Sequence, residues 1–164
     1  MNFQYWIDQL DLKAHPEGGF YRETYRSNDL IPIGTFDRFP YLRNTSTAIY
    51  FLLPSGKISA FHRILSDELW FFHAGTSLLI HSLDNVSGLQ THKLGLDIEK
   101  GDQPQITIPA QCWFGSEVED PESYSLVSCT VAPGFDFLDF EMGKRGELSE
   151  EYPEHKELIK KLTY

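Results

Sequence analysis

The chain has 164 residues, of which 41% are hydrophobic and 23% are charged, and its formal net charge is −10. This length suits one domain, residues 1–164, which buries most of its surface without disulfide bonds. The negative charge excludes nucleic acid and anionic membrane surfaces as expected partners, because their phosphate groups would repel it.

A helix is predicted at residues 3–13, followed by a turn in the segment HPEGG. The apolar side chains of the helix recur on one face, at Phe3, Trp6, Ile7 and Leu10. Pro16 and the paired glycines mark the turn. His15 and Glu17 are interpreted as exposed residues of this turn, with a place over a pocket mouth as the alternative.

Nine short β-strands are predicted next, because runs rich in branched and aromatic residues are separated by turn residues. They cover residues 20–26, 46–53, 58–64, 68–73, 77–83, 89–94, 105–109, 112–118 and 124–131. Many short strands with such turns are typical of a sandwich or barrel. The stretch 29–44 gives no consistent pattern.

The segment APGFDFLDFE alternates aromatic and acidic residues after the last strand. Its aromatic residues Phe135, Phe137 and Phe140 are interpreted as packing anchors, and its carboxylates as solvated.

A second helix is predicted at residues 149–162, where Leu158, Ile159 and Leu162 form an apolar stripe. Pro153 lies near the expected start of this helix, where proline is tolerated.

The two cysteines, Cys112 and Cys129, lie in apolar stretches and form no CxxC motif, so we expect buried free thiols in a reducing compartment. The first residues lack the basic start and apolar core of a secretory signal. No run approaches the roughly 18–20 apolar residues that a membrane span needs. We therefore expect a cytoplasmic protein.

The segment SGKISAFHRILSDELWFFHAG spaces Gly56, His62, Glu68 and Gly75 at intervals of six, six and seven residues. This spacing resembles the first motif of the cupin superfamily, in which a His-x-His strand precedes a glutamate. Ile64 occupies the place of the second histidine.

The segment IPAQCWFGSE resembles the second cupin motif, which ends in a histidine after a proline turn. Pro109 matches the proline, Gln111 stands where a glycine is common, and Phe114 stands where the histidine is expected.

Four segments, in this order, together resemble one uncharacterised cupin subfamily that is filed as a domain of unknown function. They are HPEGGFYRETYRS, TAIYFLL, HRILSDELWFFHAG and SLVSCTVAPGFDFLDFE, and the tail LSEEYPEHKELIKKLT is also similar. The resemblance implies an all-β jelly-roll barrel (a double-stranded β-helix) over about residues 20–140, with short terminal helices. It also implies homodimers.

The resemblance bears on metal binding as well, because metal-binding cupins direct three histidines and a glutamate into the barrel. Only His62 and Glu68 remain of those four positions, whereas a tight site needs about three protein ligands. We predict no metal and no other cofactor. Weak binding by His62 and Glu68, with a third ligand from His15, Glu17 or Gln111, is the alternative.

Strand alternation then predicts which side chains of the two motif strands point into the barrel and which point outward. With His62 inward, Ala60 and Ile64 also face inward, and Phe61 and Arg63 face outward. Glu68, Trp70 and Phe72 share the inner face, and Leu69, Phe71 and His73 the outer face. The outward residues Phe61, Leu69 and Phe71 require cover from a terminal helix or a second subunit, so we predict a homodimer.

We expect a small-molecule pocket inside the barrel. The residues predicted to line it or to bind the ligand are His62, Glu68, Trp70, Phe72, Gln111, Cys112, Phe114, Tyr50 and Tyr21. Arg22 and Arg26 are predicted to share a strand face, where a guanidinium pair suits phosphate or carboxylate. A solvated or glutamate-paired edge strand is the alternative.

Three functions remain open. The first is a metal-independent isomerase or epimerase acting on a sugar nucleotide or a similar polar, possibly phosphorylated metabolite, as the resemblance to cupin epimerases implies. In it His62 is the base, Glu68 orients the ring, and Tyr50 or Tyr21 is the acid. The second is a non-catalytic binding or sensing module with an aromatic wall. The third is a metal-dependent cupin enzyme.

Overall fold

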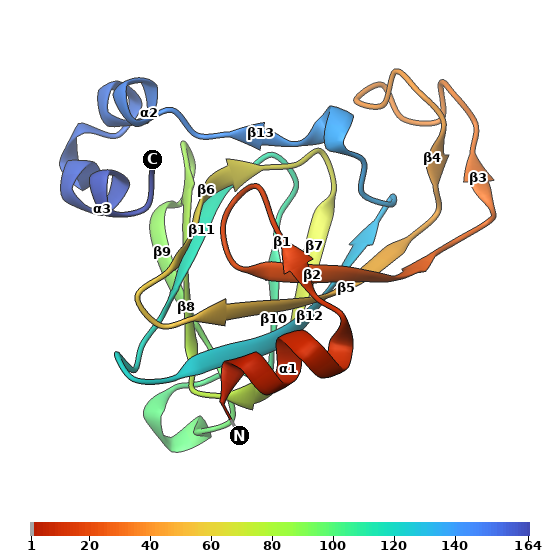
Figure 1. Ribbon diagram of the computed structural model, residues 1–164. Helices are drawn as coiled ribbons and strands as arrows, with labels where there is room; N and C mark the ends of the chain where they lie inside the picture. The colour runs from red at the N-terminus through yellow and green to blue at the C-terminus, as the bar shows by residue number, and fades with distance from the viewer. Residues whose placement is uncertain (1) are drawn as a thin grey trace.

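The protein is a jelly-roll barrel of two facing antiparallel β-sheets, with short helices near both ends of the chain (Figure 1). This computed structural model describes residues 2–164; Met1, the first residue of the predicted domain, lies outside the described residues. The six-stranded sheet contains, in spatial order, β1 (Lys13–Ala14), β2 (Phe20–Arg26), β5 (Thr47–Pro54), β12 (Tyr124–Ala132), β7 (Asp67–Gly75) and β10 (Gln105–Ile108). The five-stranded sheet contains β13 (Glu141–Met142), β6 (Ile58–Arg63), β11 (Trp113–Val118), β8 (Leu78–Asp84) and β9 (Gly88–Leu94). The predicted all-β jelly roll is confirmed.

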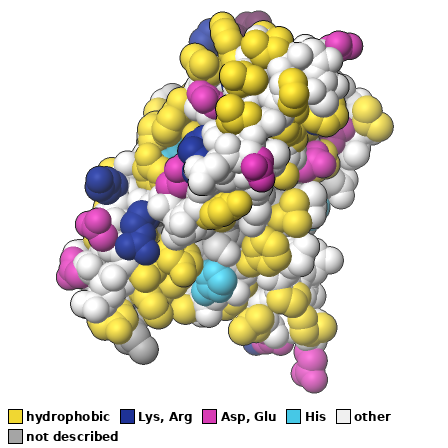
Figure 2. All heavy atoms as spheres, turned by 90° about the vertical axis from the view of Figure 1, so that its right-hand side faces the viewer, with side chains coloured by type: hydrophobic (Ala, Val, Ile, Leu, Met, Phe, Trp, Pro, Cys, Tyr) yellow, Lys and Arg dark blue, Asp and Glu magenta, His cyan; other side chains and the backbone are white. Residues whose placement is uncertain are grey.

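Each of the nine predicted strands is present, as β2 and as β5 to β12, with ends within two residues of those predicted. Two short strands that the sequence does not indicate, β3 (Leu30–Ile31) and β4 (Arg43–Asn44), pair with each other. They carry residues 29–44 away from the barrel as an arm (Figure 1). Figure 2 looks onto this side of the molecule and shows hydrophobic side chains over much of its surface. The arm contributes Leu30, Ile33, Phe36, Tyr41 and Leu42 to the exposed hydrophobic residues.

The N-terminal helix α1 (Phe3–Leu10) is shorter than the predicted helix 3–13, because Asp11 adopts the left-handed conformation with φ 50°. The side chain of Asn2 caps its first turn by accepting from the backbone N–H of Tyr5 at 3.1 Å. Its apolar stripe packs against Leu52 and Leu126 of the six-stranded sheet. The helix therefore covers one part of the outer face of that sheet.

The predicted C-terminal helix is present but interrupted, and it begins earlier than residue 149: the tail forms α2 (Arg145–Glu151), a 3-10 turn η3 (Pro153–His155) and α3 (Lys156–Lys161). Because α2 begins four residues earlier than expected, Pro153 falls just beyond its end, where proline cannot continue a helix. The two helices pack on Phe61 and Trp113, on the outer face of the five-stranded sheet. No helix within residues 2–164 has the length and apolar character to cross a membrane.

His62, Ile64, Glu68 and Trp70 face inward and Phe61 faces outward, as predicted, although a β-bulge at Ala60 and Phe61 interrupts the alternation of β6. The barrel core lies between the sheets and includes Trp70, Ile80, Ile108 and Phe114. Outward Phe61 is covered by the C-terminal helices, whereas Leu69 and Phe71 are only half-buried. The homodimer stays a prediction, which light scattering at micromolar concentration tests.

Candidate functional site

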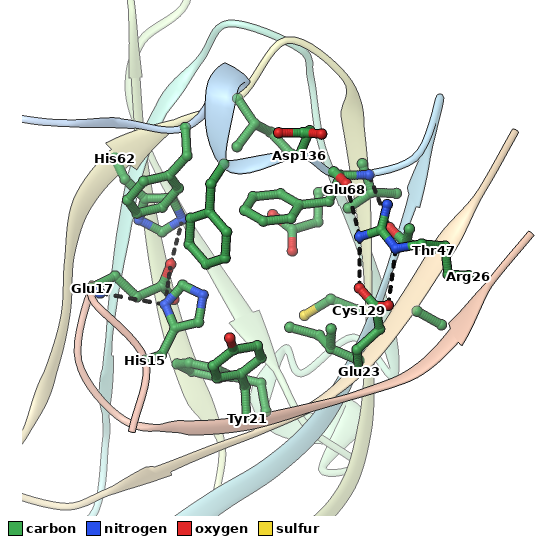
Figure 3. A pocket seen from close by; sticks show the side chains of 18 of the residues that line it. His15, Glu17, Tyr21, Glu23, Arg26, Thr47, His62, Glu68, Cys129 and Asp136 are labelled. Atoms are coloured by element: carbon green, nitrogen blue, oxygen red, sulfur yellow. Dashed lines mark hydrogen bonds and ion pairs between the residues drawn. The ribbon is translucent and has the colours of Figure 1, made fainter. Parts of the chain in front are cut away.

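A cavity of about 400 Å³ lies inside the barrel, between β2, β5, β12 and β7 of one sheet and β6 of the other (Figure 3). The segment that follows β12, including the 3-10 turn η2 (Phe137–Asp139), closes one side. The lining residues are His15, Glu17, Tyr21, Glu23, Arg26, Thr47, Ala48, Ile49, Phe51, His62, Ile64, Glu68, Trp70, Cys129, Val131, Phe135, Asp136, Phe137 and Phe140.

The cavity brings together five of the predicted site residues and leaves out six. His62, Glu68, Tyr21, Arg26 and Trp70 line it. The residues that do not line it are Tyr50, Arg22, Phe72, Cys112, Phe114 and Gln111.

Tyr50 and Arg22 lie on the opposite face of the six-stranded sheet. They are register partners on β5 and β2, and the guanidinium carbon of Arg22 lies 5.9 Å from the centre of the Tyr50 ring. Tyr50 packs with the cluster under α1. The predicted role of Tyr50 as an acid across the pocket from His62 therefore has no geometric basis.

The predicted arginine pair does not form, because a β-bulge between Glu23 and Tyr25 shifts the register of β2. An extra residue in one strand re-aims the side chains that follow it. Arg26 thereby joins Tyr21 on the cavity side, whereas Arg22 faces away.

Four of the five N–H donors of the Arg26 guanidinium are engaged at the mouth of the cavity. Nε and Nη2 donate to the Glu23 carboxylate at 2.9 and 2.7 Å. Nη1 donates to Oδ1 of Asn44 at 2.8 Å, and Nη2 also donates to the carbonyl oxygen of Phe135 at 3.1 Å. Arg26 has no free donor pair for a phosphate.

Phe114 and Cys112 are packed behind the cavity wall. The Phe114 ring is buried 4.1 Å from the His62 ring, centre to centre, so it supports that ring from outside the cavity. Cys112 lies in the core, and its thiol donates to the carbonyl oxygen of Leu83 at 3.4 Å.

Gln111 and Phe72 have structural positions outside the cavity. Gln111 has φ 66° and an exposed side chain, so it takes the left-handed turn position for which glycine is favoured. Phe72 packs against the core and lines a separate hollow.

Glu17 and His15, interpreted from the sequence as exposed, are instead buried in the cavity wall. Their side chains are 6% exposed each. The HPEGG turn folds back onto β6, where the backbone N–H of Ala60 donates to the carbonyl oxygen of Glu17 at 2.8 Å. Gly18 permits this approach, because a Cβ there would lie 2.0 Å from the carbonyl oxygen of Ile58. The paired glycines were the sequence signal for this buried turn.

Glu17 rather than Glu68 is the carboxyl partner of His62. Its Oε2 lies 3.0 Å from Nε2 of His62 and 3.3 Å from Nδ1 of His15 (Figure 3). Its Oε1 accepts from the Ser59 hydroxyl at 2.8 Å. Within residues 2–164, His62 and Glu68 form no ion pair.

Burial favours the uncharged forms of these groups. It raises the pKa of Glu17 well above its usual value, and the charge of Glu68 adds to this effect. Burial lowers the pKa of His62 to about 3 and that of His15 to about 4. The Glu17–His62 pair is therefore neutral, with the proton on the carboxyl group.

Glu68, also in the cavity wall, titrates near neutrality. Burial raises its pKa to about 7. Burial also raises the pKa of the Cys129 thiol, which keeps it protonated. A carboxyl group that is part ionised near pH 7 can both accept and donate a proton there.

Aromatic rings form the side of the cavity next to η2. Phe137 lies stacked 6.1 Å from the His15 ring, and Phe140 lies 5.3 Å from the His62 ring, centre to centre. Asp139, interpreted as solvated, is instead buried in an ion pair with Arg43 of β4, whose Nε donates to it at 2.8 Å. This ion pair ties the aromatic segment to the arm.

A family model described as "Cupin superfamily (DUF985)" matches residues 4–143. The chain belongs to this cupin family. This cupin is 41% identical to a protein of Shewanella oneidensis of known crystal structure, with a TM-score of 0.90 over 100% of this chain and 98% of that one. It is 36% identical to a hypothetical protein from Leishmania major, with a TM-score of 0.91 over 100% and 99% of the two chains. The uncharacterised protein YML079W of Saccharomyces cerevisiae is 29% identical over 150 residues, 84% of this chain and 73% of the yeast protein.

Oxalate decarboxylase of Bacillus subtilis shares only the fold with this cupin. The two are 13% identical with a TM-score of 0.57, over 93% of this chain and 37% of the decarboxylase. The predicted membership of an uncharacterised cupin family is confirmed.

The residues of this cupin do not fit the metal site of metal-binding cupins. Ile64 and Phe114, at two of the four ligand positions, have no lone pair to offer. Both ring nitrogens of His62 are occupied, Nδ1 by the carbonyl oxygen of Ala60 at 2.8 Å and Nε2 by Glu17. Residues 2–164 contain no group of three or more His, Cys, Asp or Glu side chains arranged to hold an ion.

Proposed function

We infer that this cupin binds a small, uncharged molecule in the barrel cavity and transfers a proton on it without a metal, as an isomerase or epimerase does. Glu68 is the group that takes the proton from one carbon and returns it to another carbon or to the opposite face. The observation that carries this function is the burial of Glu68 in the cavity wall with its pKa raised to about 7. Such matching of a carboxyl pKa to the working pH is typical of general acid–base sites.

The preference for an uncharged ligand follows from the charges around the cavity. Arg26 is the one Lys or Arg side chain in the described lining; its charge is paired with Glu23, and four of its five N–H donors are engaged by Glu23, Asn44 and Phe135. A phosphate group would therefore enter a cavity with no free cation to neutralise it. The cavity thus disfavours sugar nucleotides and other phosphorylated metabolites, the class that the sequence suggested.

The role of His62 also changes in this proposal. Its Nδ1 faces a carbonyl oxygen, its Nε2 faces Glu17, and burial lowers its pKa to about 3. A ring so occupied and so weakly basic is a poor general base. We assign His62 as a positioning residue for Glu17, and Glu68 as the catalytic base.

Non-catalytic binding is the second candidate, and the aromatic wall favours it. Phe137 and Phe140 lie with their rings 5.9 Å apart beside the cavity, next to His15. Such a wall stacks on flat rings whether or not a reaction follows.

The experiment combines a binding screen with hydrogen–deuterium exchange on carbon. The screen measures the melting temperature with neutral carbonyl compounds, nucleosides, aromatic acids and sugar nucleotides. Each compound that raises it is then incubated with the protein in D₂O and followed by proton NMR. We expect a neutral compound to bind and to exchange a carbon-bound proton, about a hundredfold more slowly with Glu68→Gln.

The matched control is Glu99→Gln, which changes an exposed glutamate in the same way. Exchange in this variant should equal that of the wild type. Binding without any exchange would favour the non-catalytic candidate, and unchanged exchange in Glu68→Gln would remove Glu68 from the proposed role.

A further inference from the structure

One oxygen of Glu17 faces ring nitrogens of two histidines, and the hydrogen bonds of those rings fix where their protons lie. Nδ1 of His62 lies 2.8 Å from the carbonyl oxygen of Ala60. A carbonyl oxygen only accepts, so Nδ1 carries the proton and Nε2 of the neutral ring is a lone pair. This lone pair points at Oε2 of Glu17, 3.0 Å away.

His15 has the opposite tautomer. The backbone N–H of Glu17 donates to Nδ1 of His15 at 3.3 Å, so Nδ1 is the lone pair and Nε2 carries the proton. Nδ1 also lies 3.3 Å from Oε2 of Glu17. Two acceptor nitrogens therefore converge on one carboxyl oxygen.

This arrangement is stable only if Oε2 carries a proton, because an ionised oxygen would face two lone pairs with no donor between them. The other carboxyl oxygen behaves as the carbonyl of an acid, since Oε1 accepts from the Ser59 hydroxyl at 2.8 Å. Glu17 is thus held as a carboxylic acid whose proton lies within reach of both rings.

The Nε2–H group of His15, on the side of the ring away from Glu17, faces the cavity. Figure 3 shows the His15 ring between Glu17 and the open space, beside Tyr21. The Tyr21 ring meets it edge-on at 4.5 Å, centre to centre, which fixes the plane of the His15 ring. A ligand oxygen is the acceptor that such a donor suits.

We propose that His15 donates its Nε2 proton to a carbonyl oxygen of the ligand and is reprotonated at Nδ1 by Glu17. The substrate class is then a small ketone or aldehyde with a C–H bond next to the carbonyl. The part of this proposal that concerns the C–H bond rests on the proposed function of Glu68.

The step balances in atoms and charge. The Glu68 carboxylate takes the proton from carbon, the C–H electron pair forms the carbon–carbon double bond, and the carbonyl oxygen receives the His15 proton. Glu17 gives its proton to Nδ1, so the products are an enol, a neutral His15, a protonated Glu68 and an ionised Glu17. The enol then returns to a carbonyl compound by the reverse proton transfers. Protonation at the other carbon gives an isomer, protonation on the other face gives an epimer, and neither outcome needs a redox partner.

The first test needs no ligand. Long-range ¹H–¹⁵N NMR at pH 7 distinguishes the two neutral tautomers and the imidazolium, with His15→Phe and His62→Gln variants to assign the signals. We expect His15 protonated at Nε2 and His62 protonated at Nδ1. An imidazolium at His62, or a His15 protonated at Nδ1, would overturn the proposal.

The second test compares 1-indanone with indane, its hydrocarbon counterpart. One hydrogen bond to the carbonyl should make the ketone bind about three- to tenfold more tightly. This ratio should fall to about one in His15→Phe, and it should persist in Glu17→Gln, whose amide still donates to His62. A ketone that binds no better than the hydrocarbon, or a ratio unchanged in His15→Phe, would overturn the oxygen site.

The two proposals fail separately. If Glu68→Gln leaves deuterium exchange unchanged while the ketone preference holds, the role of Glu68 is lost and the oxygen site stands. If exchange depends on Glu68 but the tautomers differ from those expected, the function stands and the Glu17–His15 relay is lost.

Discussion

Oε2 of Glu17 lies 3.0 Å from Nε2 of His62, so the carboxyl partner of this histidine comes from the turn before β2 and not from β7. In the described part of the chain Glu68 has no ion pair with His62, and burial raises the pKa of its carboxyl group to about 7. In the proposed reaction the two glutamates therefore have different roles: Glu68 exchanges a proton with carbon, and Glu17 supplies a proton to His15.

Glu68→Gln should stabilise the protein more at pH 8 than at pH 5. Folding raises the pKa of Glu68 from 4.5 to about 7, so the folded state binds more protons between these values and loses stability as the pH rises through them. Above pH 7 the buried carboxylate costs on the order of 3 kcal/mol, which glutamine removes. Thermal melting at both pH values measures the effect; a difference from wild type that is equal at pH 5 and pH 8 would contradict it.

His62→Gln should make the protein less sensitive to acid. Folding lowers the pKa of His62 from 6.5 to about 3, so below pH 6.5 the unfolded chain takes up a proton that the folded protein refuses. In this range the free energy of unfolding falls by about 1.4 kcal/mol for each unit by which the pH decreases. Urea unfolding at pH 7 and pH 4.5 should show a smaller loss in His62→Gln than in the wild type. His155→Gln, which changes a histidine of the C-terminal segment, should behave as the wild type does.

Gly18→Ala should destabilise the protein and weaken ligand binding together. Gly18 has φ 112°, and an added Cβ would lie 2.0 Å from the backbone oxygen of Ile58, so the HPEGG turn must shift and carry Glu17 with it. We expect a loss on the order of 3 kcal/mol in urea unfolding. Gly146→Ala is the matched control, because it places a methyl group in open space on α2 and should be neutral or stabilising. Equal effects of the two substitutions would refute this account of the turn.

Arg43→Met should cost about 3 kcal/mol by leaving the Asp139 carboxylate buried without its partner. The double variant Arg43→Met, Asp139→Leu should recover much of this loss, because no unpaired charge remains. Denaturant unfolding of the wild type and the three variants, including Asp139→Leu alone, gives the coupling energy between the two side chains. Additive effects would mean that the ion pair does not anchor the aromatic segment.

The strands and the facing of β6 and β7 could be predicted because they depend on local pattern. Alternation places His62 and Glu68 on the inner face wherever the strand is regular. The start of the C-terminal helical segment was predicted four residues too late, because α2 begins at Arg145 with no side-chain cap to mark it.

The composition of the site could not be predicted, because it depends on contacts between distant segments. The bulge in β2, which separates Arg22 from Arg26, is visible only in the register with β5. The burial of Glu17 depends on a backbone hydrogen bond to Ala60 across the barrel. The side of the cavity next to η2 is formed by a segment that Arg43 holds in place from the arm.

The most direct measurement is a pH titration of the glutamate side-chain carboxyl carbons by ¹³C NMR, with Glu68→Gln and Glu17→Gln used to assign the two buried groups. We predict a midpoint near pH 7 for Glu68, and for Glu17 a carboxyl signal that remains in its protonated form at that pH. A Glu68 midpoint near the ordinary 4.5, or an ionised Glu17 at pH 7, would contradict the proposed proton transfer.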